Sequence, residues 1–470
     1  MNDMSRYLFA IVLAMAVLFG WQIIFPPEQR EIVNNEINVE QDIAQLNIST
    51  DEIQNYSEPC QEDRILILSN KITGSINLCG AKIDEIFLKD FKTSTKEESD
   101  YVQFFNPKEN DNAFWIESGW KAPKNIRYNL PGNDTLWTLE EGQTLTPDTP
   151  VVISWNNDNG LIFKQKISID ENYVFNIKQE IINNSPGSIT VFPFQQLSRK
   201  EAPDGQALGL LHEGPTGYFD EELEEIDYDD IEDNDFRSEF KEGWVGIRDK
   251  YWATAITSLD KDNKRAIFKT STDAFDKFYR IGYIGDLTGA SSGESVSSVS
   301  LAFIGAKEVK IIQEYSDNNI FNRLDLIIDW GWFYFLAKPL FYILDILFSF
   351  SGNFGVAILL LTILIKVVFF PVVNRSYVQM AKMRKVQPEI TKLRELYGDD
   401  RQKMALEMQS LYKKEELKPL SGCLPVLIQI PVFFALYNVL LVALEMRHAP
   451  FFGWIKDLSA PDPISLFNGF

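Results

Sequence analysis

The feature that most constrains this 470-residue chain is a nearly continuous apolar run from Asn353 to Pro371 that contains one charged residue, Lys366. An apolar stretch of about 18 residues is long enough to cross a ~30 Å hydrocarbon core as a helix. An ammonium group inside the bilayer costs at least about 2.5 kcal/mol unless it reaches the surface or lines a wet cavity. Thr362 lies four residues before Lys366, so both side chains share one helix face. Either Lys366 extends to the nearer membrane surface, or it has a function inside the membrane.

The charge of the chain is unevenly distributed. The formal net charge is -22, which argues against nucleic acid as the main partner. Residues 26–337 contain 29 Lys and Arg against 55 Asp and Glu, whereas residues 372–422 contain 11 against 7. The first region is therefore predicted to be soluble and acidic. The second is predicted to be a cytoplasmic loop between membrane spans, because cytoplasmic loops carry an excess of Lys and Arg.

Hydropathy predicts two further spans. Residues 7–25 are almost entirely apolar and lack a small-residue cleavage site, so residues 1–25 are predicted to form an uncleaved anchor with a cytoplasmic amino terminus. A cleaved signal peptide is the alternative. Residues 423–445 form the last of the three spans and carry Gln429. Gln429 and Lys366 both fall in the cytoplasmic half of the bilayer, which favours a shared wet pocket over two unrelated polar positions.

The acidic region is predicted to be an all-β sandwich. Residues 26–63 lack sustained periodicity and indicate a flexible linker, whereas residues 64–323 contain many short apolar and alternating runs. The clearest hairpin joins residues 151–155 to residues 161–169. Its turn contains Asn159-Gly160, a pair that tolerates the positive φ of tight hairpin turns.

Two features of the acidic region have more than one interpretation. The segment Asp220–Asp235 contains eleven carboxylates in sixteen positions. We expect a solvated loop there rather than a site for a cation or a basic partner. Cys60 and Cys79 form a disulfide in an oxidising compartment or remain two free thiols. No Cys/His cluster is present, so we expect no metal site and no cofactor.

The carboxyl-terminal third is predicted to be mostly helical. Aromatic residues concentrate in residues 324–350, which indicates a helix lying on the outer membrane surface. Residues 351–371 then form the second span, and residues 372–422 a basic helical hairpin in the cytoplasm. After the third span, residues 446–470 form an outer loop and the approach to another span.

Short motifs in this part resemble those of the YidC/Oxa/Alb family of membrane protein insertases. They are Gly352–Gly355, Thr362 with Lys366 and Pro371, Met380–Arg384, Gln387-Pro388, Leu411–Lys413, Pro419–Pro425, Gln429–Pro431, Leu444–Arg447 and Trp454–Leu458. Upstream, Gly243–Trp252 and the amino-terminal anchor resemble the Gram-negative YidC form, whose large periplasmic domain is a β-supersandwich. The resemblance implies an inner-membrane insertase and chaperone that acts without enzymatic chemistry.

The resemblance also implies a site. The family has a hydrophilic groove, open to the cytoplasm, that contains a basic residue on the second span, and Lys366 occupies that place. Members of the family commonly have Arg at this position. Lys keeps the positive charge but lacks the planar guanidinium group of Arg. Thr362 and Gln429 would hydrate the groove. The implied partners are nascent membrane proteins, the Sec translocon with its auxiliary components, ribosomes or signal-recognition targeting factors, and membrane lipid. The docking residues would be Arg384, Lys385, Lys392 and Arg394.

Two other classes of function remain open from the residues alone. A membrane-tethered periplasmic binding module would explain the sandwich but would leave Lys366 without a role. A channel or transporter would explain the intramembrane charge, although three spans without internal repeats suit alternating access poorly. Members of the family continue into further spans that complete a five-helix core, so we expect the chain to be a fragment.

Overall fold

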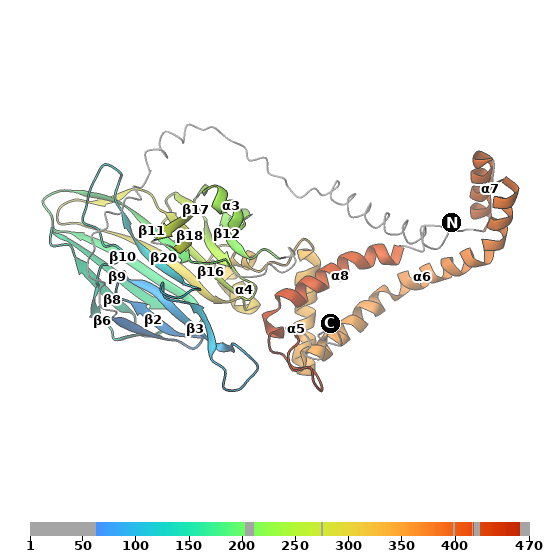
Figure 1. Cartoon of the computed structure of the whole chain (residues 1–470), viewed down its shortest axis with the longest axis horizontal. Coiled ribbons are helices and arrows are strands. Elements are labelled where there is room, and N and C mark those ends of the chain that lie inside the picture. Colours follow the sequence, from blue (N-terminus) through green and yellow to red (C-terminus); the bar gives the residue numbers. More distant parts are fainter. Residues whose placement is uncertain are drawn as a thin grey trace. The chain divides into compact units, whose positions relative to one another are not determined.

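The computed structural model describes residues 63–202, 211–273, 276–397, 400–415, 417 and 424–460. The predicted anchor and nearly all of the predicted linker lie outside these ranges. The described residues form two units. The residues up to Gly331, together with those from Asn438 onward, form the first unit, and Trp332–Tyr437 forms the second. Figure 1 shows the strands of the first unit and the helices of the second.

Two large sheets make up the first unit, which we call the sheet domain, and they confirm the predicted all-β sandwich-like fold. The larger sheet has the order β14-β17-β18-β11-β5-β3-β2-β1-β7, with β19 on β11 and β4 on β3. Its strands are β1 (Arg64–Leu68), β2 (Ile72–Asn77), β3 (Lys82–Lys92), β4 (Tyr101–Phe105), β5 (Phe114–Lys121), β7 (Thr144–Leu145), β11 (Ile189–Arg199), β14 (Phe236–Phe240), β17 (Lys264–Asp273), β18 (Asp276–Ile284) and β19 (Thr288–Ala290).

The smaller sheet has the order β13-β12-β15-β16-β20-β10-β9-β8-β6. Its strands are β6 (Thr138–Glu141), β8 (Val151–Asn156), β9 (Leu161–Ile169), β10 (Val174–Asn183), β12 (Gly214–Phe219), β13 (Glu222–Glu225), β15 (Gly243–Arg248), β16 (Trp252–Ser258) and β20 (Ser295–Ala306). Alternate side chains of β9, among them Phe163 and Ile167, are buried. This alternation places one face of each strand in the core between the sheets.

The predicted hairpin is confirmed by β8 and β9, which pair antiparallel with Val151 opposite Ile167. Gly160 has a φ of 87°, as the turn prediction requires. The second residue with positive φ is Asp158 (φ 58°) rather than Asn159. A short polar side chain tolerates this left-handed conformation. A Cβ at Gly160 would lie 2.9 Å from the Cα of Ser185, so the turn also needs the missing side chain.

The acidic segment Asp220–Asp235 is not a loop, contrary to the prediction. It contains β13, which pairs with β12, and the helix α3 (Tyr228–Asp233). The side chains of Ile226, Tyr228 and Ile231 are buried, whereas most of the carboxylates are exposed. The apolar residues give the segment a buried face, so the like charges form the solvated outer face of a folded element.

Cys79 is disulfide-bonded. The other two cysteines, Cys60 and Cys423, lie outside the described residues. The pairing of Cys79 with Cys60 therefore stays a prediction.

The helical part differs from the prediction in where its first long helix begins. After α4 (Val309–Asp317) and the 3-10 helix η1 (Leu324–Ile327), the helix predicted from residue 324 begins ten residues later, as α5 (Tyr334–Ser351). A turn at Gly331 (φ 69°) separates η1 from α5. The second span and the first arm of the hairpin are one helix, α6 (Phe354–Tyr397). α7 (Arg401–Lys414), α8 (Leu424–Val442) and the 3-10 helix η3 (Leu444–Met446) follow.

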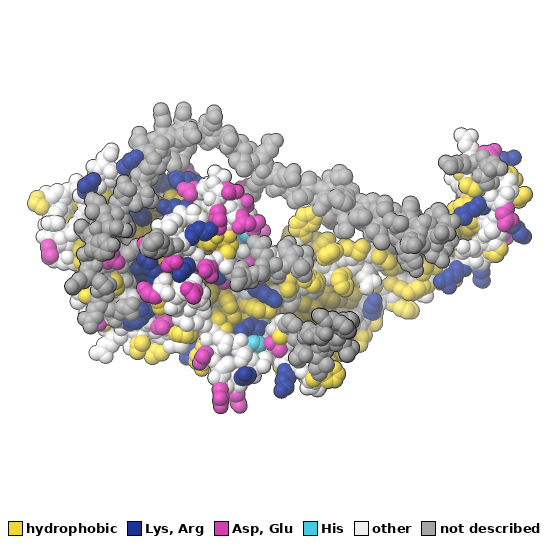
Figure 2. Space-filling model, viewed as in Figure 1, with side chains coloured by type: hydrophobic (Ala, Val, Ile, Leu, Met, Phe, Trp, Pro, Cys, Tyr) yellow, Lys and Arg dark blue, Asp and Glu magenta, His cyan; other side chains and the backbone are white. Residues whose placement is uncertain are grey.

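Within the described residues, α5, α6 and α8 are long and apolar enough to cross a membrane. Hydrophobic side chains cover these helices, whereas charged side chains are interspersed over the sheet domain (Figure 2). By length and composition α5 could span as well as lie on the surface, so its predicted interfacial position stays a prediction.

Candidate functional site on the membrane helices

The turn between α5 and α6 fixes where the helix with Lys366 begins. Gly352 ends α5 in the left-handed conformation (φ 65°), where its N–H donates to the Phe348 carbonyl. The side-chain oxygen of Asn353 accepts a hydrogen bond from the Val356 N–H at 3.1 Å, as a helix N-cap does. The rings of Phe348 and Phe354 stack with centroids 4.0 Å apart. These contacts define the first turn of α6.

Lys366 lies on the side of α6 that faces away from α5. The two helices pack together, and the buried residues at the start of α6 include Phe354, Ala357 and Leu361. Lys366 follows Leu361 by five residues, which places it roughly 140° around the helix. Its side chain is exposed. α5 therefore leaves the Lys366 face of α6 uncovered.

The surroundings of Lys366 are apolar. Ile363, Val367 and Phe370, which lie within one turn of it, are all more than half exposed. No hydrogen bond or ion pair involves the Lys366 ammonium within the part of the chain that the structure describes. The hydroxyl of Thr362, one turn earlier, donates to the Ile358 carbonyl at 2.8 Å. The ammonium is thus a free charge on an otherwise apolar helix surface.

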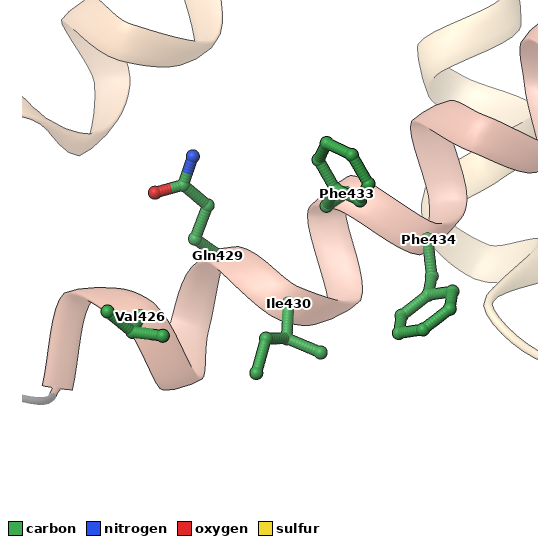
Figure 3. A pocket seen from close by; sticks show the side chains of 5 residues that line it. All are labelled: Val426, Gln429, Ile430, Phe433 and Phe434. Atoms are coloured by element: carbon green, nitrogen blue, oxygen red, sulfur yellow. The ribbon is translucent and has the colours of Figure 1, made fainter. Parts of the chain in front are cut away.

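Gln429 lies on α8 and is exposed. It borders a shallow hollow on the helix surface whose lining residues are Val426, Gln429, Ile430, Phe433 and Phe434. Figure 3 shows the Gln429 amide pointing to the opposite side of α8 from Ile430. No hydrogen bond joins the described side chains of Lys366, Thr362 and Gln429, so the structure does not by itself bring the three predicted groove residues together.

The predicted hairpin consists of the end of α6 and α7, which pack against each other. Its apolar core is formed by Val386, Leu411 and Leu417, with Met383, Ile390, Leu393 and Tyr412 packed against it. Asp400 caps α7 by accepting from the Lys403 N–H at 3.1 Å. Leu396 and Leu406 do not belong to this core, because they are 72% and 66% exposed.

The four predicted docking residues are all exposed on the α6 arm of this hairpin: Arg384, Lys385, Lys392 and Arg394. In Figure 2, Lys and Arg side chains gather over the end of α6 and α7. The hairpin therefore presents a basic surface, while its core residues Val386, Leu411 and Leu417 are buried.

Sequence reasoning missed a buried polar cluster where the sheet domain leads into α5. Arg248 is fully buried, and its guanidinium lies 3.7 Å from the Asp329 carboxylate and donates to the His212 carbonyl at 3.0 Å. The N–H of His212 donates to Asp329 at 3.0 Å. Lys307 is also buried, with 3% of its surface exposed. A charged residue inside the Gly243–Trp252 motif was the only sequence signal of this cluster.

The structure describes no group of three or more His, Cys, Asp or Glu side chains that could hold a metal ion.

Comparison with known proteins decides the family. Residues 64–343 match the YidC periplasmic domain, and residues 346–468 match the family described as 60Kd inner membrane protein. The chain belongs to the YidC family of membrane protein insertases. The membrane protein insertase YidC of Rickettsia bellii is 39% identical over 478 residues, which cover 100% of this chain and 85% of the relative. That of Rickettsia canadensis is 38% identical with the same coverage.

Family membership confirms the predicted class. This chain is a membrane protein insertase rather than an enzyme, its substrates are nascent membrane proteins, and it resides in the inner membrane with a periplasmic sheet domain. A galactose mutarotase related enzyme from Lactobacillus acidophilus aligns with 52% of this chain and 97% of its own, at a TM-score of 0.38 and 12% identity. A resemblance this distant has no bearing on activity.

Proposed function

We propose that Lys366, Thr362 and Gln429 line a hydrophilic groove, open to the cytoplasm, through which the chain inserts membrane proteins. The Lys366 ammonium attracts acidic groups in the substrate segment that must cross to the periplasm. The apolar helix of the substrate then moves into lipid along the exposed apolar surface beside Lys366.

The observation that carries this proposal is that Lys366 and Gln429 lie at similar depths in the membrane. Lys366 lies 12 residues after Phe354, the first residue of α6, and Gln429 lies 13 residues before Val442, the last residue of α8. At about 1.5 Å per residue, both lie roughly 18–20 Å from those helix ends. If Phe354 and Val442 both lie at the periplasmic surface, Lys366 and Gln429 lie in the cytoplasmic half of a hydrocarbon core of ~30 Å.

A contact within the sheet-domain unit supports that condition. Arg447, five residues after α8, donates to the Lys92 carbonyl at 2.7 Å. Because residues 64–343 form the periplasmic domain, this contact favours a periplasmic position for the end of α8. With α6 and α8 both crossing, the hairpin is then cytoplasmic and α5 remains on the periplasmic surface. If α5 also crossed, the residues after α8 would lie in the cytoplasm, away from Lys92.

The Lys366 ammonium can attract an acidic substrate segment by Coulomb forces alone, with no covalent step. Unit charges at 4 Å attract by roughly 4 kcal/mol at an effective dielectric of 20, against about 1 kcal/mol in water. The apolar neighbours of Lys366 lower the local dielectric, so one ammonium is enough to bias the entry of an acidic segment. The exposed basic residues of the hairpin would dock ribosomes, targeting factors or anionic lipid, and the sheet domain would contact the Sec translocon and its auxiliary components.

The first test measures insertion of a short single-span protein in cells depleted of their own insertase, scored by protease protection of its outer segment. We expect Lys366→Ala to lower insertion at least tenfold, about 1.4 kcal/mol in barrier height, and Lys366→Arg to retain it. The matched control exchanges two neighbours, Lys366→Val with Val367→Lys. It keeps the charge and nearly its depth but turns it about 100° around the helix.

We expect the exchanged variant to fail like Lys366→Ala at equal abundance. If Lys366→Ala inserts every substrate as well as the wild type, Lys366 only extends to the membrane surface and the charged-groove mechanism is wrong. If the exchanged variant is fully active, depth matters but the face of α6 does not.

A further inference from the structure

The end of α8 and the loop that follows it are each attached to the sheet domain. We propose that Asn438 and Arg447 lock the carboxyl-terminal end of α8 onto the sheet domain, so that this end of the helix and the domain move as one body. The inference does not depend on the charged groove, because it concerns only contacts within the sheet-domain unit.

Arg447 makes the first attachment. Its Nη2 donates to the Lys92 carbonyl at 2.7 Å, and its guanidinium lies 5.4 Å from the centre of the Trp252 ring. Phe91 packs edge-on against Trp252 with ring centroids 5.1 Å apart. A cation over an aromatic face contributes about 0.5–2 kcal/mol, and a charged donor strengthens a hydrogen bond. Arg447 is thus held by a charged hydrogen bond to the Lys92 carbonyl and by a cation–π contact with the Trp252 ring.

Lys92, which accepts this bond, is the last residue of β3. The pairing of β3 with β4 shifts register between Leu88 and Lys92. Such irregularities interrupt the regular ladder of backbone hydrogen bonds. Lys92 itself lies opposite Tyr101 of β4, and its carbonyl accepts from Arg447.

The loop that carries Arg447, residues 443–460, is braced internally. The carboxylate of Asp457 accepts from the N–H groups of His448 and Ser459, at 3.1 and 2.8 Å, and from the Ser459 hydroxyl at 2.6 Å. The Leu458 N–H donates to the Ala449 carbonyl at 3.0 Å. These hydrogen bonds make the loop rigid. The distance between Arg447 and the end of α8 is therefore nearly fixed.

Asn438 makes the second attachment, within the last turns of α8. Its side-chain amide is buried and donates to the Trp330 carbonyl at 3.3 Å. At Gly331 a Cβ would lie 2.0 Å from the Asn438 amide nitrogen, so only glycine permits this approach. The neighbouring Asp329 accepts from the Gly331 N–H at 2.8 Å and is itself held by Arg248 and the His212 N–H. The amide therefore bonds to a part of the domain that is itself fixed.

The two attachments give the sheet domain a mechanical link to a membrane helix. Asn438 follows Gln429 by nine residues on the same helix, about 13.5 Å along its axis. A displacement of the domain, such as one caused by a bound partner, would move the end of α8, residues Asn438–Val442, with it.

Hydrogen exchange of the full chain in detergent micelles tests the proposal. We expect Arg447→Ala to speed exchange of the amides of 443–449 and of the α8 end, 438–442, by roughly tenfold. Arg447→Lys should give a smaller increase, because Lys can still donate to the Lys92 carbonyl. Lys456→Ala is the matched control, since it removes an exposed cation from the same loop and should change neither segment.

Amide exchange of β10 reports whether the sheet domain remains folded. If Arg447→Ala loses the protection of β10, Trp252→Leu is used as the test variant instead. It removes the ring that Arg447 contacts and should speed exchange of the same two segments. Unchanged exchange in both segments would overturn the proposal. Faster exchange of the loop alone would also overturn it, because Asn438 would then hold the end of α8 without any help from Arg447.

Discussion

Two lysines show how burial and charge are balanced at single residues. Lys366 is exposed on an apolar helix, whereas Lys307 is buried in the sheet domain beside the fully buried Arg248. Burial first, and then the Arg248 charge, lower the pKa of Lys307 from 10.5 to about 7, against the opposing effect of nearby carboxylates, Asp329 first among them. The charged form of Lys307 thus destabilises the folded domain.

This predicts a pH dependence for the stability of the sheet domain. In the unfolded chain Lys307 stays protonated up to a pKa of about 10.4. Between pH 7 and 10 the unfolded state therefore binds more protons at this residue, and its contribution to the free energy of unfolding rises with pH. Below pH 7 Lys307 is protonated in both the folded and the unfolded state, so the free energy that its buried charge costs the folded domain no longer changes with pH. We expect the wild type to gain stability relative to Lys307→Met from pH 7 to 10, measured by urea unfolding of the full chain. A pH-independent difference would contradict this.

At the scale of elements, α6 shows that the end of an apolar run need not be the end of a helix. The apolar run ends near Pro371, where the prediction ended the span, but the helix continues through Pro371 and Pro388 to Tyr397 and is 44 residues long in all. Its length is about 66 Å, more than twice the hydrocarbon thickness. A proline removes one backbone donor and kinks or breaks a helix depending on its context. The change from lipid-facing to water-facing composition therefore occurs within one helix.

The hairpin offers a matched pair of substitutions. Leu411 is 8% exposed in its core, whereas Leu406 on the same helix is 66% exposed. We expect Leu411→Ala to destabilise the hairpin by about 2–5 kcal/mol and Leu406→Ala by less than about 0.5 kcal/mol. Amide exchange of residues 401–414 measures both. Equal effects would show that α7 does not pack against α6 through Leu411.

At the scale of the whole molecule, the proposed topology assigns each segment to one side of the membrane. Lys456→Cys should react with an impermeant maleimide in intact cells, and Gln409→Cys only after the inner membrane is permeabilised; both side chains are exposed. Labelling is compared with the unsubstituted chain, which contains three cysteines. The reverse pattern would mean that α5 crosses the membrane and that the topology argument from Arg447 is wrong.

Much of this protein follows from sequence periodicity. Alternating residues predicted the β8–β9 hairpin, and unbroken hydropathy predicted α8, because both signals depend on neighbours in the chain. Helical spacing predicted the hairpin within residues 372–422. The acidic segment was mispredicted because its charges outnumber the few apolar residues that fold it.

Contacts between distant residues were decided only by the tertiary structure. The sequence by itself determined the all-β domain, the apolar helices, the position of Lys366 on one of them and, through its motifs, the family. It contained no signal that Arg447 bonds to Lys92, 355 residues away, or that Asn438 reaches Trp330. Such pairs have no periodicity, because they depend on where the folded chain places two surfaces, and a lone arginine or asparagine looks the same in the sequence whether it is solvated or bonded.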